Sequence, residues 1–412
     1  MFGWMLKSLC EHCHSDPDPE RREGEREESR SGIKGPARFL PFAPLRVGMT
    51  VETGFSAFGL VIPIMTRNYR SAILGSITIV GLCVFGPSTP SFPTLQTPSP
   101  SSSFLDHGAP AVPRQRTLIF VGDVMLSRGV GRRMEAKGDW GYPFRPVSGV
   151  LHGADLAYCN LECPVSDRGR NLHHLYSFRA DPRALEGLKE AGFTIVSEAN
   201  NHAYDWGPAA LADTLGRLHA IGIRTVGAGE NTLEAHHPTV VDLDGLRVAF
   251  LAYVNIDPQE AAAGAEHPGV AWLDLEQVTS DIRFARNLAD LVVVCPHWGV
   301  EYATAPTRQQ QELARRMVDA GADLIVASHP HVVQPLEQYR GRWIAYSLGN
   351  FIFDQKDPAT HRGLMLKVTV CDKKIAEVTK VPIEINADCQ AVLAPPKVQV
   401  SHLLLATRLP HP

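Results

Sequence analysis

Six apolar runs in this chain stop abruptly at polar side chains that can bind a metal ion or a substrate. Each run has the length and the aliphatic content of a buried strand. In an α/β sheet, ligands bind beyond the carboxyl ends of the strands, so the sequence predicts a metal site there. The runs and the residues after them are 118–122 before Asp123; 156–159 before Asn160 and Glu162; 193–196 before Asn200, Asn201 and His202; 291–295 before His297; 324–327 before His329 and His331; and 344–348 before Gly349 and Asn350.

Length and composition limit the class of protein. The 412 residues have room for one large domain with extra segments, or for two domains. A formal net charge of −4 gives no overall positive field, so nucleic acid is not an expected partner. The folded region holds an odd number of cysteines, and Cys159 and Cys295 lie inside strand runs as small apolar residues, so no disulfide framework is predicted.

The first part of the chain has the composition of an export region. Residues 1–64 include a charge run almost without aliphatic side chains, which predicts disorder. Residues 65–86 start with two arginines and end in sixteen uncharged residues, which fits a secretory signal peptide or a short membrane anchor. Residues 87–114 are rich in Pro and Ser and predict an extended linker. The protein is therefore expected to be exported, either membrane-anchored or extracytoplasmic.

The place of this signal is unusual, because a signal normally lies at the N-terminus. We therefore expect Met65 to be the true start of the protein and residues 1–64 to be a mis-called extension.

From residue 115 to 386, strand and helix patterns alternate, which predicts an α/β domain with helices covering a largely parallel sheet. Pro near the start and Gly after the end delimit several helices. Residues 387–412 are expected to form a tail. The predicted elements are helices at 181–191, 207–220 and 308–320, a loop over the strand ends at 255–270, and a hairpin of strands 363–371 and 375–384.

Within this domain, the spacing of the polar residues places them on common sides. Asn160 and Glu162 flank Leu161, so in an extended segment both point the same way. His329 and His331 flank a proline, and this spacing suits one ion or a pair of ions. Carboxylate, amide and imidazole groups without a ligating cysteine favour Zn, Mn or Fe, as one or two divalent ions.

His202 is the candidate for acid–base chemistry. Asp205 follows it by three residues and can hold its ring in one tautomer. Each of these motifs also has a structural explanation when it is taken alone, such as a strand-capping Asp or a loop ion pair. Their joint occurrence at six strand ends favours a functional centre.

These residues lie in motifs that resemble the CapA-like capsule biosynthesis proteins, bacterial proteins tied to poly-γ-glutamate capsule synthesis within the calcineurin-like metallophosphoesterase superfamily. The resemblance covers about residues 117–384 in matching order. The motifs are Gly122-Asp123-Val124-Met125-Leu126, Asn160-Leu161-Glu162, Ala199-Asn200-Asn201-His202, His297-Trp298-Gly299-Val300-Glu301-Tyr302, Ser328-His329-Pro330-His331-Val332-Val333-Gln334 and Ser347-Leu348-Gly349-Asn350-Phe351.

The resemblance implies a four-layer αββα sandwich in which helices cover two mixed sheets. It also implies a set of site roles. Asp123 and His331 would bind one metal, Asn201, His297 and His329 the second, Glu162 would bridge them, and His202 would be the general acid.

Two departures weaken the likeness to two-metal phosphatases. Those enzymes follow the first Asp with x-His, whereas Val124 and Met125 stand here, and a thioether is a poor ligand for such ions. The bridging acid also lies in Asn-Leu-Glu rather than Gly-Asp-x-x-Asp. A single tightly bound ion at Asn201, His297 and His329 is therefore an alternative.

Three functions stand together at this stage. The first is a metal-dependent hydrolase or transferase at the cell surface that acts on an anionic polymer or a phosphorylated substrate. Arg179 is its candidate anion clamp, and Asn160 and Asn350 are its other substrate-binding candidates. The second is a non-catalytic accessory of a membrane-embedded capsule synthesis complex, which Met125 favours. The third, a cytosolic phosphoesterase, disagrees with residues 65–86.

Overall fold

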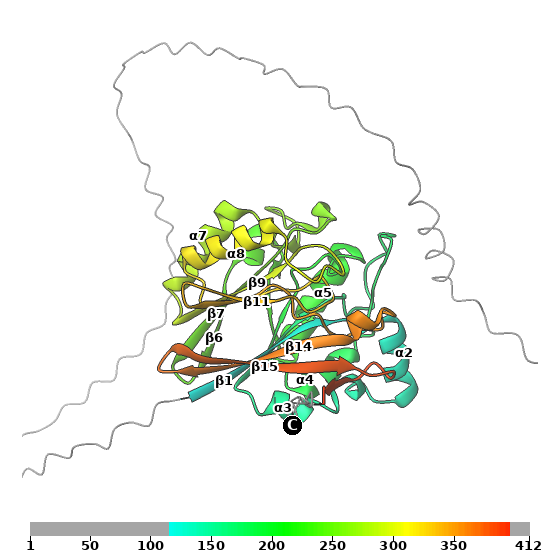
Figure 1. Cartoon of the computed structure of the whole chain (residues 1–412). Coiled ribbons are helices and arrows are strands. Elements are labelled where there is room, and N and C mark those ends of the chain that lie inside the picture. Colours follow the sequence, from blue (N-terminus) through cyan, green and yellow to red (C-terminus); the bar gives the residue numbers. More distant parts are fainter. Residues whose placement is uncertain (1–114, 396–412) are drawn as a thin grey trace, which may run out of the picture. The chain divides into compact units, whose positions relative to one another are not determined.

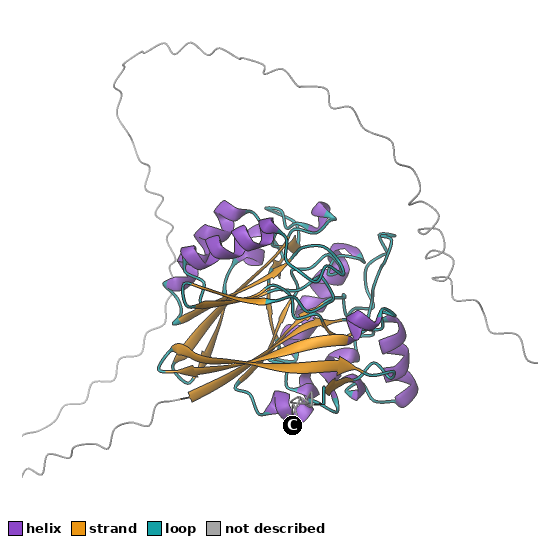
Figure 2. Ribbon diagram, viewed as in Figure 1, coloured by secondary structure: helices purple, strands orange, loops and turns teal. Residues whose placement is uncertain are grey.

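The computed structural model describes residues 115–395 of the protein. Two β-sheets lie face to face in it, and helices cover their outer faces (Figure 1). The layers thus run helix, sheet, sheet, helix (Figure 2).

The first sheet has the strand order β16-β15-β14-β1-β2-β3-β4, and β13 also pairs with β1. β1, β2, β3, β4 and β13 pair with one another in parallel, whereas β14 is antiparallel to β1 and to β15, and β15 is antiparallel to β16. The strands are β1 (Gln115–Val124), β2 (Leu156–Leu161), β3 (Ile195–Ser197), β4 (Arg224–Val226), β13 (Asn350–Ile352), β14 (Arg362–Cys371), β15 (Lys374–Ile385) and β16 (Ala391–Leu393).

The second sheet has the order β11-β12-β10-β9-β7-β6. Its four central strands are parallel, and an antiparallel strand closes each edge. A separate antiparallel pair, β5 with β8, lies outside both sheets. The strands are β5 (Ala228–Gly229), β6 (Thr239–Leu243), β7 (Leu246–Val254), β8 (Gly269–Val270), β9 (Leu291–His297), β10 (Leu324–Val326), β11 (Leu336–Tyr339) and β12 (Arg342–Ala345).

Helices of both outer layers begin or end at residues that cap them. Thr307 and Gln310 form a capping box at the start of α8, and Gly192 ends α4 in a left-handed conformation with φ of 98°. The helices are α2 (Arg128–Lys137), α3 (Ser148–His152), α4 (Ala184–Ala191), α5 (Gly207–Ala220), α6 (Thr232–His236), α7 (Leu275–Arg286) and α8 (Arg308–Ala320), with short 3-10 turns η1 (Tyr142–Phe144), η2 (Gln259–Ala261) and η3 (Pro358–His361).

Burial on both faces explains why the strands are apolar along their whole length. In β1, Leu118 and Phe120 belong to the core between the sheets, while Ile119 and Val121 belong to the core under the outer helices. Tyr158 of β2 stacks on Phe250 of the facing sheet, with ring centroids 6.1 Å apart. The sheets are therefore held together by interdigitated side chains, which fixes where their strand ends meet.

The structure confirms some sequence predictions and corrects others. The helices expected at 181–191, 207–220 and 308–320 and the hairpin of β14 and β15 are present. The expectation of one largely parallel sheet is wrong, because the strands divide into two mixed sheets. Periodicity shows that a strand is buried, but it does not show which strands pair.

The predicted tail also begins too early. Asn386 closes a turn by accepting hydrogen bonds from the backbone of Asp388 and Gln390, and β16 then pairs with β15. The segment 255–270 contains η2 and β8 rather than loop alone.

The predicted disordered region at 1–64, the signal or anchor at 65–86 and the linker at 87–114 lie outside the described residues. Among residues 115–395, we find no helix that is both long and apolar enough to cross a membrane.

The ring contacts between the sheets predict a large stability effect. Phe250→Ala should lower the free energy of unfolding by about 3–5 kcal/mol, because the side chain is fully buried between both sheets. Phe284→Ala removes the same atoms from a side chain that is 49% exposed and should cost about 1 kcal/mol or less. Urea denaturation of both variants measures the difference, and equal losses would contradict this packing.

Candidate metal centre

The strand register brings the polar residues of the first sheet together. Asp123 at the end of β1 lies opposite Asn160 of β2 on one side and Asn350 of β13 on the other. In the second sheet, His297 ends β9 and forms an isolated bridge with Ser328, just after β10. The ends of strands from both sheets thus deliver polar side chains to one place.

Two carboxylates lie at the point where these strand ends meet. Asp123 and Glu162 are fully buried, and the Asn160 side-chain amide donates to both, at 2.9 Å to Asp123 Oδ1 and 3.2 Å to Glu162 Oε2. Their other oxygens, Asp123 Oδ2 and Glu162 Oε1, have no hydrogen-bond partner. Burial and the neighbouring charge of Asp123 raise the pKa of Glu162 well above its usual value. A bound cation would satisfy these oxygens.

Asn200 fixes the orientation of the amide between the carboxylates. Its side-chain nitrogen donates to Asn160 Oδ1 at 3.1 Å and to the Leu161 carbonyl at 2.9 Å. The Asn160 nitrogen therefore points at the carboxylates, and its oxygen points away from them.

The imidazoles lie against the carboxylates. Single donor atoms of Asp123, Glu162 and His297 lie within 4.8 Å of one another, which is the spacing of a metal site. His297 Nε2 is 2.8 Å from Asn201 Oδ1, and the rings of His297 and His329 are 4.9 Å apart. The structure thus places Asn201, His297 and His329 next to one another.

His331 lies against both carboxylates, and its ring centroid is 6.0 Å from that of His329. Its Nδ1 is 3.4 Å from Asp123 Oδ2, and its Nε2 is 3.7 Å from Glu162 Oε1. Asn350 Oδ1 is 2.9 Å from His331 Nδ1. All six side chains that the sequence predicted as metal ligands therefore come together, and ligation itself stays a prediction.

Burial keeps two of these histidines neutral. Desolvation, followed by the charges of the neighbouring histidines, lowers the pKa of His297 well below its usual value. Desolvation also lowers the pKa of His329, to about 3, with a further lowering by His331. A neutral imidazole has a free lone pair, so both side chains are ready to bind a cation at neutral pH.

An uncommon backbone conformation places the two histidines of the His-Pro-His segment. His329 has φ of 97° and His331 has φ of 57°, values that non-glycine residues seldom adopt. Backbone strain of this kind is concentrated at functional sites. The spacing predicted that the two rings lie on the same side, and their centroids are 6.0 Å apart. The positive φ angles of both residues, which the spacing did not predict, produce this arrangement.

His202 and Asp205 form the hydrogen bond that the sequence predicted, with 2.9 Å between Nδ1 and Oδ2. The His202 ring also stacks on Phe178, with centroids 4.0 Å apart. Asp205 in addition accepts from the Phe178 backbone at 2.7 Å and lies 3.2 Å from His174 Nδ1. His174 was not predicted, because its contact spans 31 residues and has no sequence pattern.

The three predicted substrate-binding residues have different surroundings. Asn160 and Asn350 are buried and bonded to Asp123 and His331, so they orient these groups. Arg179 is exposed, and its guanidinium carbon lies 3.5 Å from the centre of the Trp206 ring. Their substrate-binding roles stay predictions.

Met125, which the resemblance to two-metal phosphatases aligns with a histidine, is buried in the core under the outer helices. Its sulfur accepts hydrogen bonds from the backbone and the hydroxyl of Ser127, at 3.1 and 3.0 Å.

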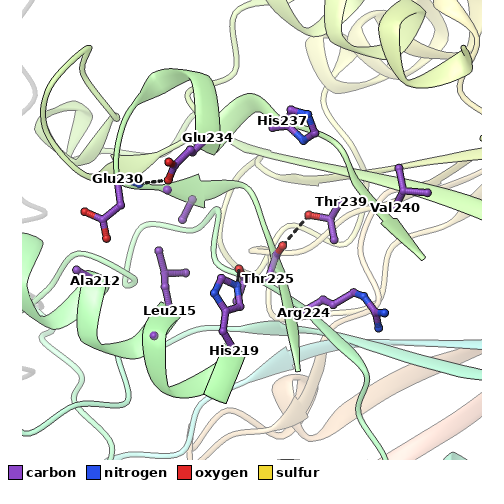
Figure 3. A pocket seen from close by; sticks show the side chains of 13 residues that line it. Ala212, Leu215, His219, Arg224, Thr225, Glu230, Glu234, His237, Thr239 and Val240 are labelled. Carbon is purple, nitrogen blue, oxygen red and sulfur yellow. Dashed lines mark hydrogen bonds between the residues drawn. The ribbon is translucent and has the colours of Figure 1, made fainter. Parts of the chain in front are cut away.

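A separate cavity of about 580 Å³ lies between α5, β4, α6 and β6 (Figure 3). His219, Arg224 and Glu234 are among its lining residues, and His219 Nε2 is 2.9 Å from Thr225 Oγ1. None of the predicted ligands lines this cavity, so the chemistry of the centre does not take place there.

Residues 117–355 match the family described as "Bacterial capsule synthesis protein PGA_cap", which is more than half of the chain. The chain belongs to this family of bacterial capsule synthesis proteins.

Named relatives agree with this family. The chain is 36% identical to the "Capsule biosynthesis protein CapA" of Bacillus anthracis over 66% of this chain and 67% of that protein. It is 35% identical to the "PGA biosynthesis protein CapA" of Bacillus subtilis, over 68% and 73%. A Mycobacterium tuberculosis relative, "Probable polyglutamine synthesis accessory protein", is 30% identical over 61% and 71%.

Solved structures are more distant. A hypothetical protein and a 5'-nucleotidase precursor, both from Thermus thermophilus, align with TM-scores of 0.44 and 0.41. Their identities are 17% and 16%, over 65% and 68% of this chain and 99% and 54% of theirs. At these scores neither likeness decides the fold or the function.

Glu162→Gln should stabilise the metal-free protein at alkaline pH. Because the folded pKa of Glu162 is raised, its contribution to stability is lost as the pH rises above the unfolded value of about 4.3. Glutamine removes that loss, so the gain in unfolding free energy should grow from pH 5 to pH 8. Denaturation in a chelator measures it, with the exposed Glu377→Gln as control. A gain that does not change with pH would contradict the prediction.

His329→Ala should weaken metal binding at least about tenfold, because removal of even an indirect ligand contact costs about 10–100-fold. Metal content after dialysis against the divalent ion measures this. The exposed His237→Ala variant should keep the wild-type content. Equal content in both variants would remove His329 from the ligand set.

Proposed function

We propose that this protein is a metal-dependent hydrolase of capsule polymer synthesis, exported and working outside the cytoplasm. The buried pair of Asp123 and Glu162, each with an oxygen that has no partner, is the observation that supports a metal centre. Membership of the capsule synthesis family supports an anionic polymer or a phosphorylated intermediate as its substrate.

The residues present fit one or two divalent ions of Mn, Zn or Fe. Two carboxylates would supply the negative charge, and the neutral donors would complete the set. When bound, such an ion supplies a water of lowered pKa and polarises the oxygen of the bond to be cleaved. The residues that would hold it are Asp123, Glu162, Asn201, His297, His329 and His331.

His202 is the proposed general acid. Asp205 accepts a hydrogen bond at Nδ1, which leaves Nε2 as the nitrogen that can reach a leaving group. Phe178 covers one face of the ring and limits the access of water to it. A protonated His202 would therefore donate from a fixed position to the leaving oxygen or nitrogen.

The arrangement of helix, sheet, sheet and helix supports the proposal that this is the four-layer sandwich of the metallophosphoesterases. Residues 65–86 support export, with either a cleaved signal or a retained anchor. A membrane-embedded capsule synthesis complex is the proposed partner.

A non-catalytic accessory role is the second candidate. Met125 occupies the place of a phosphatase ligand and is packed into the core, which favours it. The name of the Mycobacterium tuberculosis relative also contains the word accessory. Against this role stands the bonded pair of His202 and Asp205, because a purely structural metal site needs no oriented acid.

Hydrolysis of a simple phosphodiester and a simple phosphomonoester separates the two candidates. The metal-loaded protein should hydrolyse at least one, and His202→Gln should lower kcat by about 10²–10⁴-fold with unchanged metal content, because the proton donor is lost. His173→Gln, in an exposed loop, is the matched control. Metal bound tightly without any turnover would support the accessory role instead.

A further inference from the structure

Arg128, the first residue of α2, holds its guanidinium against two aromatic rings. Its Cζ atom lies 4.7 Å from the centre of the Phe178 ring and 5.8 Å from the centre of the Phe353 ring. The side chain is 18% exposed, so it is neither sealed in the core nor free on the surface. A guanidinium in such a partly desolvated place interacts more strongly with an anion than one in bulk water.

Each of these rings also contacts a histidine of the candidate centre. Phe178 stacks on His202, and Phe353 lies 4.9 Å from His331 between ring centroids. Arg128 is therefore one ring away from the proposed general acid and one ring away from a predicted ligand. Arg179, the clamp that the sequence suggested, instead lies on Trp206 and is exposed.

The guanidinium already binds a carboxylate of the protein itself. Asp354 pairs with Arg128 through Nη2 and accepts a hydrogen bond from the Gly129 backbone at 2.8 Å. Arg128 Nε has no hydrogen-bond partner among the described residues. The first turn of α2 contains no acidic residue, so Asp354 is the anion that the structure places at this helix end.

We propose that Arg128 binds the anionic group of the substrate, a phosphate or a carboxylate, which replaces Asp354 on the guanidinium. A planar guanidinium binds both kinds of anion in a bidentate way. In the free protein, Asp354 occupies the position that the substrate anion takes, on a guanidinium that only the Phe178 ring separates from His202. This inference rests on the proposed function, since it names a substrate contact of the same centre.

A purely structural role of the pair makes different predictions. If Arg128 and Asp354 only attach the segment after β13 to α2, their replacement lowers stability and leaves anion binding unchanged. Anion affinity, measured apart from hydrolysis, therefore decides between the two roles.

The experiment is calorimetric titration of the full-length, metal-loaded protein with inorganic phosphate and, separately, with glutarate. Arg128→Gln should weaken the tighter of the two probes by about 10–100-fold, the usual effect of hydrogen bonds to a charged group. Arg132→Gln, an exposed arginine of the same helix, should change it less than about twofold. Asp354→Asn should tighten binding, because it removes the competing charge and keeps an acceptor for Gly129. The probe that binds more tightly shows whether the substrate anion is a phosphate or a carboxylate.

Wild-type affinity in Arg128→Gln, a larger loss in Arg179→Gln, or no binding of either probe to the wild-type protein would overturn the proposal. If Arg128→Gln does not fold, the anion affinity of Asp354→Asn is the test. Tighter anion binding than in the wild-type protein supports the proposal, and unchanged or weaker binding overturns it. If anion binding depends on Arg128 but the protein hydrolyses neither ester, this inference is supported and the proposed hydrolase function is wrong. If the wild-type protein hydrolyses an ester and Arg128→Gln binds the anion normally, only this inference is wrong.

Discussion

The burial of two carboxylates side by side is the constraint on which the rest of the centre depends. Asp123 and Glu162 are fully buried, and the side-chain amide of Asn160 donates a hydrogen bond to each of them. Two like charges at this distance and depth are unfavourable unless a proton or a cation compensates them. The register of β1 with β2 brings them together, and the core between the sheets prevents their separation.

Much of the fold could be predicted from residue patterns because its strands are buried on both faces. The run before Asp123 is apolar without alternation, since its side chains enter the core between the sheets and the core under the helices in turn. Pairing could not be predicted in the same way. β13 lies beside β1 although more than 200 residues separate them, and the short strand β16 depends on a turn that Asn386 makes locally.

The candidate centre shows the same division between local and distant information. His202 and Asp205 are three residues apart, and their hydrogen bond follows from that spacing. Asn350 was expected at a strand end, but its contact with His331, which comes from another segment, was not predicted. Arg128 was not predicted at all, because its neighbour Phe178 is 50 residues away in the sequence. The sequence suggested Arg179 as an anion clamp, but it could not show that the guanidinium lies on the half-buried ring of Trp206, 27 residues further along the chain.

Asp205 joins His202, the proposed proton donor, to a neighbouring stretch of backbone. One of its oxygens contacts His202 and the amide of Phe178, and its own carbonyl accepts from the amide of Leu172. Any displacement of the segment 172–178 therefore stretches bonds to the same residue that sets the tautomer of the imidazole. A molecule that binds to the exposed side chain of Leu175 would therefore act on the proposed acid through the one carboxylate that both share.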